Sequence, residues 1–437
     1  MKLAFKQKLL KKISPTKDEV AAQQAFAHSL AEKILKHVKA KAVLVGSAAR
    51  DTGLRGDNDI DLFLLFPRKN SEKQIVARTI KAVKKSIRAK WVMHYAEHPY
   101  LKTTLKGFEV EVIPCFESKP HAGIKSAVDR SPLHMTYLQE RLTTEQRADV
   151  RLLKLLLKSN KLYGAELAIQ GFSGLVCEYL ILNYRNLEEL IKEATKWKPP
   201  VIINFVNEKP NKFTEPFVLV DAIDENRNAG AVVSETNLNR FISLCQALQK
   251  KPSEKFFQKH ENKITPNQIK KAIKQRGTTP IVIELSAPEL IEDILVPQLR
   301  KTEKNLVKQL QTHGFKIVGS TSLLKNNAEI LLELESKHKP ALKTRNGPPA
   351  SNEQAVKKFL KGKKPVRGPF IKNGRIIIEE IEKETNAISF LEKTLRKPTI
   401  FGCASHFTKA CLKAKISEKV FNKESAVKYY SKRDWWL

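Results

Sequence analysis

The chain has few features that would tie it to a membrane or to an oxidising compartment. Its 437 residues contain no run of about 18 apolar residues, so the sequence predicts no transmembrane helix. The basic N-terminus is not followed by an apolar segment, and we therefore expect no signal peptide. Five cysteines are scattered without a CxxC pair, which predicts reduced thiols and a cytoplasmic protein rather than a disulfide framework.

Acidic residues are scarce relative to basic ones. Lys and Arg number 79 against 46 Asp and Glu, which gives a formal net charge of +33 and a pI near 9.8. Because the surplus is spread over the whole chain, it predicts a polyanionic partner, although part of it is ordinary solvated surface. No amphipathic helix with Trp or Phe along one face stands out, so we expect no membrane partner.

The pattern along the chain predicts two or three domains, since 437 residues exceed one ordinary core. Helices are predicted at 15–41, 71–90, 288–313 and 351–361, and continuously helical chain from about 141 to 255. Strands are predicted at 91–96, 107–114, 281–285, 315–321, 328–335 and 375–379, with a basic loop from Lys343 to Pro349. A lysine-rich stretch at 250–278 marks a boundary. The predicted class is therefore α+β multidomain.

The most informative pattern is a Gly-Ser turn followed by two aspartates on a strand. An apolar strand ends at Gly46 and Ser47, and a second strand carries Asp59 and Asp61. Alternation places the two carboxylates on one strand face. The opposite face carries Ile60, Leu62 and Leu64. Neighbouring carboxylates repel one another unless cations neutralise them, and two divalent metals about 3.5–4 Å apart would do so while clamping a phosphoryl displacement.

The turn itself suits a phosphate ligand. Gly46 permits close backbone approach, and Ser47 at a helix N-terminus offers a hydroxyl and N–H groups to a triphosphate. A lone Asp-x-Asp is most often a solvated turn or an edge position. The preceding Gly-Ser and the strand–turn–helix–strand context favour catalysis, and the pattern resembles the polymerase-beta-like nucleotidyltransferase superfamily.

Further segments extend the resemblance over nearly the whole chain. They lie at 96–100, 111–116, 128–134, 171–178, 220–221, 227–228 and 369–375. Together they resemble the archaeal (class I) CCA-adding enzymes, the tRNA nucleotidyltransferases. The resemblance implies a nucleotidyltransferase head of mixed sheet and helices at 1–150 and a helical central domain at 151–278. It also implies an α+β tail domain at 279–437 that binds the acceptor–TΨC arm of tRNA.

The resemblance also implies roles for single residues. Asp59 and Asp61 match a metal-binding pair that holds two Mg²⁺ ions, and Glu111 stands where the third carboxylate is usually Asp. Triphosphate contacts correspond to Ser47, Arg50, Lys154 and Tyr163, and the nucleotide pocket to Gly46, His98, Arg130 and His134. Arg227 matches an arginine that reads the incoming base. Without the resemblance, the histidines would be read as structural residues, and Lys154 and Arg227 as solvated ones.

The expected activity is stepwise addition of C, C and A to the 3′ end of tRNA from CTP and ATP, with release of pyrophosphate. The Asp-x-Asp head alone leaves open a poly(A) polymerase or a transferase of small molecules. A non-catalytic RNA-binding protein with a relic head is the alternative from another class, and the intact aspartate pair speaks against it. The sequence leaves the oligomeric state open, a homodimer included.

Overall fold

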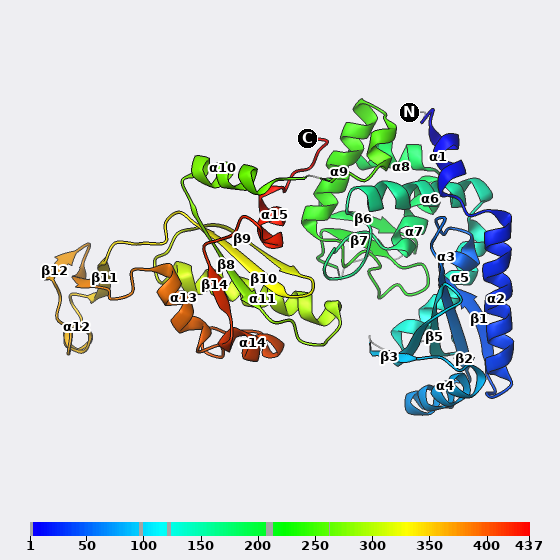
Figure 1. Ribbon diagram of the computed structural model, residues 1–437, viewed down its shortest axis with the longest axis horizontal. Helices are drawn as coiled ribbons and strands as arrows, with labels where there is room; N and C mark the ends of the chain where they lie inside the picture. Colours follow the sequence, from blue (N-terminus) through cyan, green and yellow to red (C-terminus); the bar gives the residue numbers. More distant parts are fainter. Residues whose placement is uncertain (1–2, 96–98, 120–123, 207–212, 262) are drawn as a thin grey trace. The chain divides into compact units, whose positions relative to one another are not determined.

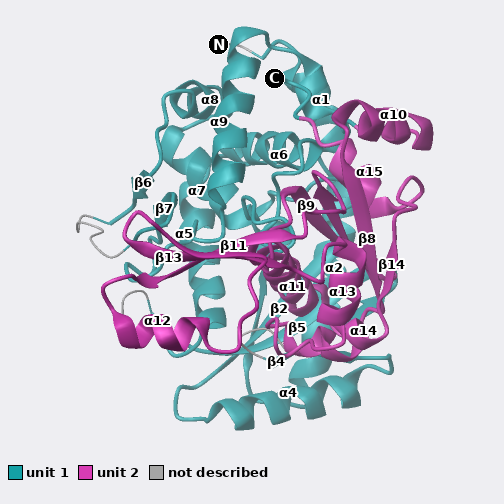
Figure 2. Cartoon of the chain, turned by 90° about the vertical axis from the view of Figure 1, so that its left-hand side faces the viewer, with its two compact units in different colours: residues 1–260, 434–437 teal, residues 261–433 magenta. Residues whose placement is uncertain are grey.

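The computed structural model describes residues 3–95, 99–119, 124–206, 213–261 and 263–437 (Figure 1). The chain forms two compact units, residues 1–260 with 434–437 and residues 261–433 (Figure 2). Within the described ranges, no helix is both long enough and apolar enough to cross a bilayer. The finer division into three domains stays a prediction.

The first unit begins with a five-stranded mixed sheet in the order β1-β2-β5-β4-β3. Its strands are β1 (Lys41–Val45), β2 (Asp59–Phe66), β3 (Val92–Tyr95), β4 (Pro99–Leu105) and β5 (Phe108–Phe116). Strands β2 and β5 run parallel, and the other neighbours run antiparallel. The predicted head of mixed sheet and helices is confirmed, although the sequence did not predict β4.

Alternation along β2 separates two faces of this sheet, as predicted. Ile60, Leu62 and Leu64 are at most 1% exposed and pack under α2 (Lys17–Leu35) and α4 (Glu72–Ser86). The opposite face carries the aspartates and also packs Phe63 in a small cluster close to α5 (Arg130–Arg141). A buried support therefore lies beneath a face that is free to carry polar groups.

Helix α2 begins at a capping box that the sequence encodes. The Glu19 amide donates to the Thr16 hydroxyl at 3.1 Å, and the Thr16 amide donates to the Glu19 carboxylate at 2.6 Å. The helix ends earlier than the predicted 15–41, because Val38 packs against the core from the segment that follows the helix. Helix α4 likewise ends before Ile87, so the predicted 71–90 is too long.

The rest of the first unit packs helices around a second apolar core. They are α1 (Lys6–Ile13), α5, α6 (Thr144–Ser159), α7 (Gly174–Tyr184), α8 (Leu187–Ala194) and α9 (Glu235–Lys250), with short 3₁₀ turns at Ala127–Asp129 and Glu254–Phe257. The prediction of uninterrupted helix over 141–255 is wrong, because β6 (Val201–Asn204) and β7 (Phe217–Val220) form a parallel pair. All four residues of β7 are buried, so its sequence shows no alternation to distinguish a strand from a buried helix.

The second unit contains two antiparallel sheets. One has the order β14-β8-β10-β9 and the other the order β11-β13-β12. Their strands are β8 (Thr279–Leu285), β9 (Ile317–Leu324), β10 (Ala328–Leu334), β11 (Leu342–Pro349), β12 (Arg367–Lys372), β13 (Arg375–Ile381) and β14 (Lys415–Ser417). The helices are α10 (Pro266–Arg276), α11 (Glu292–Thr312), α12 (Glu353–Leu360), α13 (Ala387–Leu395), α14 (Thr408–Leu412) and α15 (Glu424–Tyr430), with a 3₁₀ turn at Ser405–Phe407.

The predicted basic loop from Lys343 to Pro349 is wrong, since the segment pairs with β13 as strand β11. Its two charged residues, Lys343 and Arg345, are both basic, and Gly347 is its one buried residue, so strand formation depends on backbone pairing rather than on a buried apolar face. The long helix predicted at 288–313 is present as α11, and Gly314 follows it with φ +85°.

The last four residues return to the first unit. Trp435 stacks on His260 with ring centroids 3.9 Å apart, and its indole donates to the Asn160 side chain at 3.0 Å. Trp436 donates to Ser243 at 3.2 Å. The C-terminal aromatic segment is therefore packed as an anchor.

Candidate active site

Acidic side chains from two parallel strands meet on the polar face of the first sheet. In the register of β2 with β5, Asp61 lies opposite Glu111 and Asp59 lies opposite Glu109. Burial, followed by repulsion from Glu111 and Asp59, raises the pKa of Asp61 to about 7. Burial and the neighbouring acids Asp57 and Glu109 also raise the pKa of Asp59. The face thus concentrates negative charge that the protein itself compensates only in part.

The Gly-Ser turn lies directly against this face. Gly46 has φ +79°, and a Cβ at that position would lie 2.2 Å from Asp61 Oδ2. A side chain is therefore excluded at Gly46 both by the backbone conformation and by the carboxylate. Ser47 follows in α3 (Gly46–Arg50), which connects the turn to the rest of the site.

A lysine holds the two glutamates of β5. Lys102 of β4 lies 2.9 Å from Glu109 and 3.2 Å from Glu111. These hydrogen bonds, that to Glu109 first, raise the pKa of Lys102. Among the described residues, no group of three or more His, Cys, Asp or Glu side chains is arranged to hold a metal ion. Glu111 lies beside Asp61 in register, but its carboxylate is engaged by Lys102.

A second charged cluster connects α3 to the helices behind it. Arg50 Nε donates to Glu178 Oε1 at 3.0 Å, and Arg50 Nη2 lies 2.9 Å from Oε2. Thr52 donates to the same carboxylate at 2.6 Å, and Lys154 Nζ donates to the Thr52 carbonyl at 2.9 Å. Burial raises the pKa of Glu178, but the Arg50 and Lys154 charges outweigh it and hold that pKa below its usual value.

Tyr163 stands between α6 and α7 in the sequence, and its hydroxyl lies next to this cluster, close to Gly174 at the start of α7. A Cβ at Gly174 would lie 3.1 Å from the Tyr163 hydroxyl and 3.8 Å from Lys154 Nζ. Lys154 is only 2% exposed, and burial lowers its pKa. Arg50, Lys154 and Tyr163, which the sequence placed far apart, are thus brought to one part of the first unit.

Two cavities border these groups. The first, of about 320 Å³, is lined by Gly46, Arg50, Asp61, Glu111, Ser131 and His134, among others. The second, of about 520 Å³, is lined by Lys125, Arg130, Arg227 and Asn228, among others. Both cavities border the start of α5, and between them they contain part of the predicted site. Ser47, Asp59, Lys154 and Tyr163 line neither cavity. His98 lies outside the described residues.

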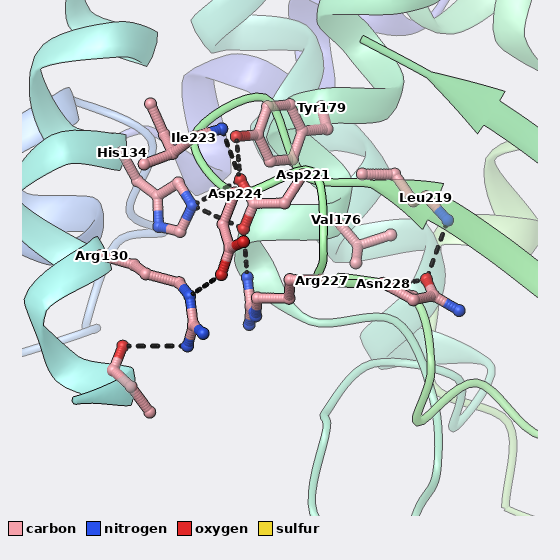
Figure 3. Close-up of polar contacts among 12 residues, drawn as sticks. Arg130, His134, Val176, Tyr179, Leu219, Asp221, Ile223, Asp224, Arg227 and Asn228 are labelled. Carbon is pink, nitrogen blue, oxygen red and sulfur yellow. Dashed lines mark hydrogen bonds and ion pairs between the residues drawn. The ribbon is translucent and has the colours of Figure 1, made fainter. Parts of the chain in front are cut away.

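Arg130, His134 and Arg227 converge on the loop that follows β7 (Figure 3). Arg130 Nε donates to Asp224 at 2.8 Å, and Arg227 Nη1 donates to Asp221 at 2.6 Å. His134 Nε2 lies 2.8 Å from Asp221 Oδ1. The three residues are therefore held by carboxylates of one loop.

Sequence reasoning assigned no role to Glu178, Asp221 or Asp224. Glu178 carried a usable signal, because it stands in the apolar run Leu175–Leu180, where a lone carboxyl requires a buried partner. Asp221 follows the apolar run of β7 in the same way. Asp224 carried no comparable signal, since it stands in a polar loop.

The mixed sheet, the Gly-Ser turn and the carboxylate face define a polymerase-beta-like nucleotidyltransferase. Three family models match successive parts of the chain. They are a nucleotidyltransferase domain at 27–134, the second domain of tRNA nucleotidyltransferase at 148–258 and the C-terminal domain of CCA-adding enzyme at 276–406.

Related proteins align with this chain over most of its length. The CCA-adding enzyme of Archaeoglobus fulgidus is 36% identical over 383 residues, which are 87% of this chain and 86% of that protein. The CCA-adding enzyme of Halobacterium salinarum is 35% identical over 399 residues, 89% of this chain and 88% of that protein. The chain belongs to the family of CCA-adding enzymes.

Proposed function

We propose that this chain adds C, C and A stepwise to the 3′ end of tRNA, using CTP and ATP and releasing pyrophosphate. The observation that carries the proposal is the pairing of Asp61 with Glu111 beside the Gly46 turn. It occurs in a chain whose similarity to CCA-adding enzymes extends over 87% of its length.

Asp59, Asp61 and Glu111 hold two Mg²⁺ ions in this proposal. The donors are all carboxylate oxygens, which suit Mg²⁺. Burial, followed by repulsion from Glu111 and Asp59, raises the pKa of Asp61, and a divalent cation would relieve that repulsion. Two such ions, when bound, lower the pKa of the terminal 3′-hydroxyl and stabilise charge at the α-phosphate. Glu111 takes part by moving its carboxylate away from Lys102, 3.2 Å distant.

Ser47, Arg50, Lys154 and Tyr163 serve the triphosphate, next to the backbone of Gly46. Arg50 supports this most directly, because Glu178 binds its Nε and Nη2 and the side chain lines the cavity that contains Asp61. Because two nitrogens of the guanidinium are bound to Glu178, the plane of the group is fixed, and with it the direction in which Nη1 can donate to a phosphate. Lys154 adds buried positive charge near the Tyr163 hydroxyl, since both side chains lie close to Gly174.

Arg130, His134 and Arg227 serve the base and sugar in this proposal. His98, for which the resemblance implies the same role, lies outside the described residues. Cytosine and adenine each present an exocyclic amino donor beside a ring acceptor. A guanidinium has donors only, so Arg227 serves the ring acceptor, and backbone phosphates of the bound tRNA serve the amino group. The cavity of about 520 Å³ beside Arg227 supports this assignment.

The tRNA is bound mainly through its phosphates, since the chain carries a net charge of +33. The α+β tail at 279–437 holds the acceptor–TΨC arm. We place the protein in the cytoplasm because all five cysteines are free thiols. Light scattering of the purified chain measures its mass in solution, and a mass of twice that of one chain would indicate a homodimer.

Labelled CTP and ATP, offered with tRNA that lacks its CCA end, test the activity. We expect a product longer by three nucleotides with the sequence C, C, A. A homopolymer of A would instead indicate a poly(A) polymerase, and no incorporation would indicate an RNA-binding protein. Asp61→Ala is the matched control and is expected to remove incorporation of both nucleotides while leaving tRNA bound.

A further inference from the structure

Asp221 is a buried carboxylate on which three parts of the first unit converge (Figure 3). It directly follows β7, and its side chain is 0% exposed. The Tyr179 hydroxyl of α7 donates to Oδ1 at 3.0 Å, and the Ile223 amide donates to Oδ1 at 3.0 Å. His134 Nε2 of α5 lies 2.8 Å from Oδ1 and 2.9 Å from Oδ2.

The fourth partner is Arg227. Its Nη1 donates to Asp221 Oδ2 at 2.6 Å, and the Asp221 amide donates to the Arg227 carbonyl at 3.1 Å. The arginine is therefore tied to Asp221 both through its backbone and through its guanidinium. Its side chain is 35% exposed and lines the cavity of about 520 Å³. Among the described residues, the guanidinium donates one hydrogen bond, that from Nη1 to Asp221. Its other N–H groups are therefore available to a ligand.

Asp221 is ionised in this environment. Burial raises the pKa of its carboxyl, but hydrogen bonds and charge from His134, with the Ile223 amide and Arg227, outweigh burial and hold that pKa well below its usual range. An ionised carboxylate accepts hydrogen bonds only, so His134 Nε2 is the donor. A buried negative charge paired with a half-exposed guanidinium fixes the plane of the guanidinium before any ligand arrives.

The loop that contains Asp221 is also held along α5. His134 and Arg130 stand one helical turn apart, and they contact Asp221 and Asp224 respectively. His134 lines the cavity that contains Asp61, whereas Arg227 lines the neighbouring cavity. One carboxylate thus orients a side chain at each of the two cavities.

We propose that Asp221 is a positioning residue for nucleotide selection, which orients Arg227 toward the ring acceptor of the incoming base without touching the base itself. The inference rests on the proposed function, in which Arg227 contacts CTP and ATP. An arginine released from Asp221 would retain its charge but lose its fixed direction. It would still attract a triphosphate, whereas it would distinguish the bases poorly.

Selectivity measured in a double-mutant cycle tests the proposal. The variants are Asp221→Asn, Arg227→Ala and the double variant, each assayed with CTP, UTP, ATP and GTP on one tRNA. We expect Asp221→Asn to lower the ratio of kcat/KM for CTP over UTP, and for ATP over GTP, by about tenfold. In the Arg227→Ala background, Asp221→Asn should lower these ratios little further, because both changes remove the same oriented donor. Glu225→Gln is the matched control, since it neutralises an exposed carboxylate in the same loop and should keep the natural ratios.

Thermal unfolding of each variant shows whether it is folded at the assay temperature. If Asp221→Asn is unfolded, Asp221→Glu takes its place, because it keeps the charge but displaces it by one methylene and should lower the ratios in the same direction. An equal loss of rate with all four nucleotides, or additive losses of selectivity in the cycle, would overturn the role of Asp221. If Arg227→Ala itself keeps the natural selectivity, the base-reading role of Arg227 is wrong and the inference fails with it. If Arg227→Ala loses selectivity and Asp221→Asn does not, only the inference fails.

Discussion

Arg50 and Glu178 form a buried ion pair although they stand 128 residues apart in the sequence. The pair joins α3, which begins at the Gly-Ser turn, to α7 of the second apolar core. Thr52 donates to the same carboxylate at 2.6 Å, so the acid has two donors from the segment that follows the turn. The position of the turn against the carboxylate face therefore depends on a residue far along the chain.

Replacing Glu178 should destabilise the first unit. Glu178→Gln leaves the Arg50 charge buried without its partner, and we expect a loss of about 3–5 kcal/mol in the free energy of unfolding, measured by urea denaturation. Glu189→Gln on α8 is the control, because its pair with Lys192 is about half exposed and its loss should cost at most about 0.5 kcal/mol. An unchanged unfolding free energy for Glu178→Gln would contradict the structural importance of the pair.

Gly46 is expected to tolerate no side chain. Gly46→Ala would place Cβ 2.2 Å from Asp61 Oδ2 and displace the carboxylate, so we expect the rate of C and A addition to fall by about a hundredfold. Gly107→Ala is a matched control, since Gly107 has a similar φ of +84° but no atom within 4 Å of the added Cβ. The control should lose stability and keep its activity per folded molecule. Equal activity losses in both variants would point to backbone strain rather than to Asp61.

The second unit should lose stability in acid through Glu333. This carboxylate on β10 is 0% exposed and accepts hydrogen bonds from Arg276 at 2.6 Å, Tyr429 at 2.8 Å and Tyr430 at 3.1 Å. Burial raises its pKa, but hydrogen bonds from Arg276, Thr278 and Tyr429, together with the Arg276 charge, outweigh burial and hold the pKa below its usual value.

Because the folded-state pKa of Glu333 is depressed, its contribution to stability is present above the unfolded pKa of about 4.3 and is lost as pH falls through the folded pKa. Urea unfolding at successive pH values compares the natural chain with Glu333→Gln. We expect the natural chain to be the more stable at pH 7 and the difference to shrink below pH of about 4. A difference that stays constant down to pH of about 3 would contradict the assignment.

The sequence predicted those parts of the fold that depend on local pattern. The alternation of Ile60, Leu62 and Leu64 in β2 is such a pattern, and it is confirmed. The capping box of Thr16 and Glu19 at the start of α2 depends likewise on residues three apart in the sequence. Strand β7 was missed because a short, fully buried run has no alternation, and β11 was missed because pairing with β13 creates it.

The candidate site shows the same limit. Spacing predicted that Asp59 and Asp61 share a face, because a strand fixes neighbours two residues apart. It could not predict that Glu178 holds Arg50, or that Asp221 holds both His134 and Arg227. These contacts join residues from different elements, and only the packed core brings them within hydrogen-bonding distance.

The two glutamates of β5 provide the sharpest test of the proposed metal ligands. Glu111 lies opposite Asp61 and its charge contributes to the raised pKa of Asp61, whereas Glu109 lies opposite Asp59. Both carboxylates contact Lys102, so each is a matched control for the other with respect to that lysine.

We expect Glu111→Gln to lower C and A addition alike by at least about a hundredfold, because it removes a charged ligand needed at every addition. Glu111→Asp keeps the charge and shortens the arm by one methylene, so its rate should stay within about tenfold of the natural chain. Glu109→Gln should stay close to the natural rate, since it removes a partner of Lys102 and no proposed ligand. The measurement is the rate of CTP and ATP incorporation on one tRNA at several Mg²⁺ concentrations, and raised Mg²⁺ should partly restore Glu111→Asp. If Glu109→Gln loses activity while Glu111→Gln remains active, the third ligand lies one strand repeat earlier, opposite Asp59.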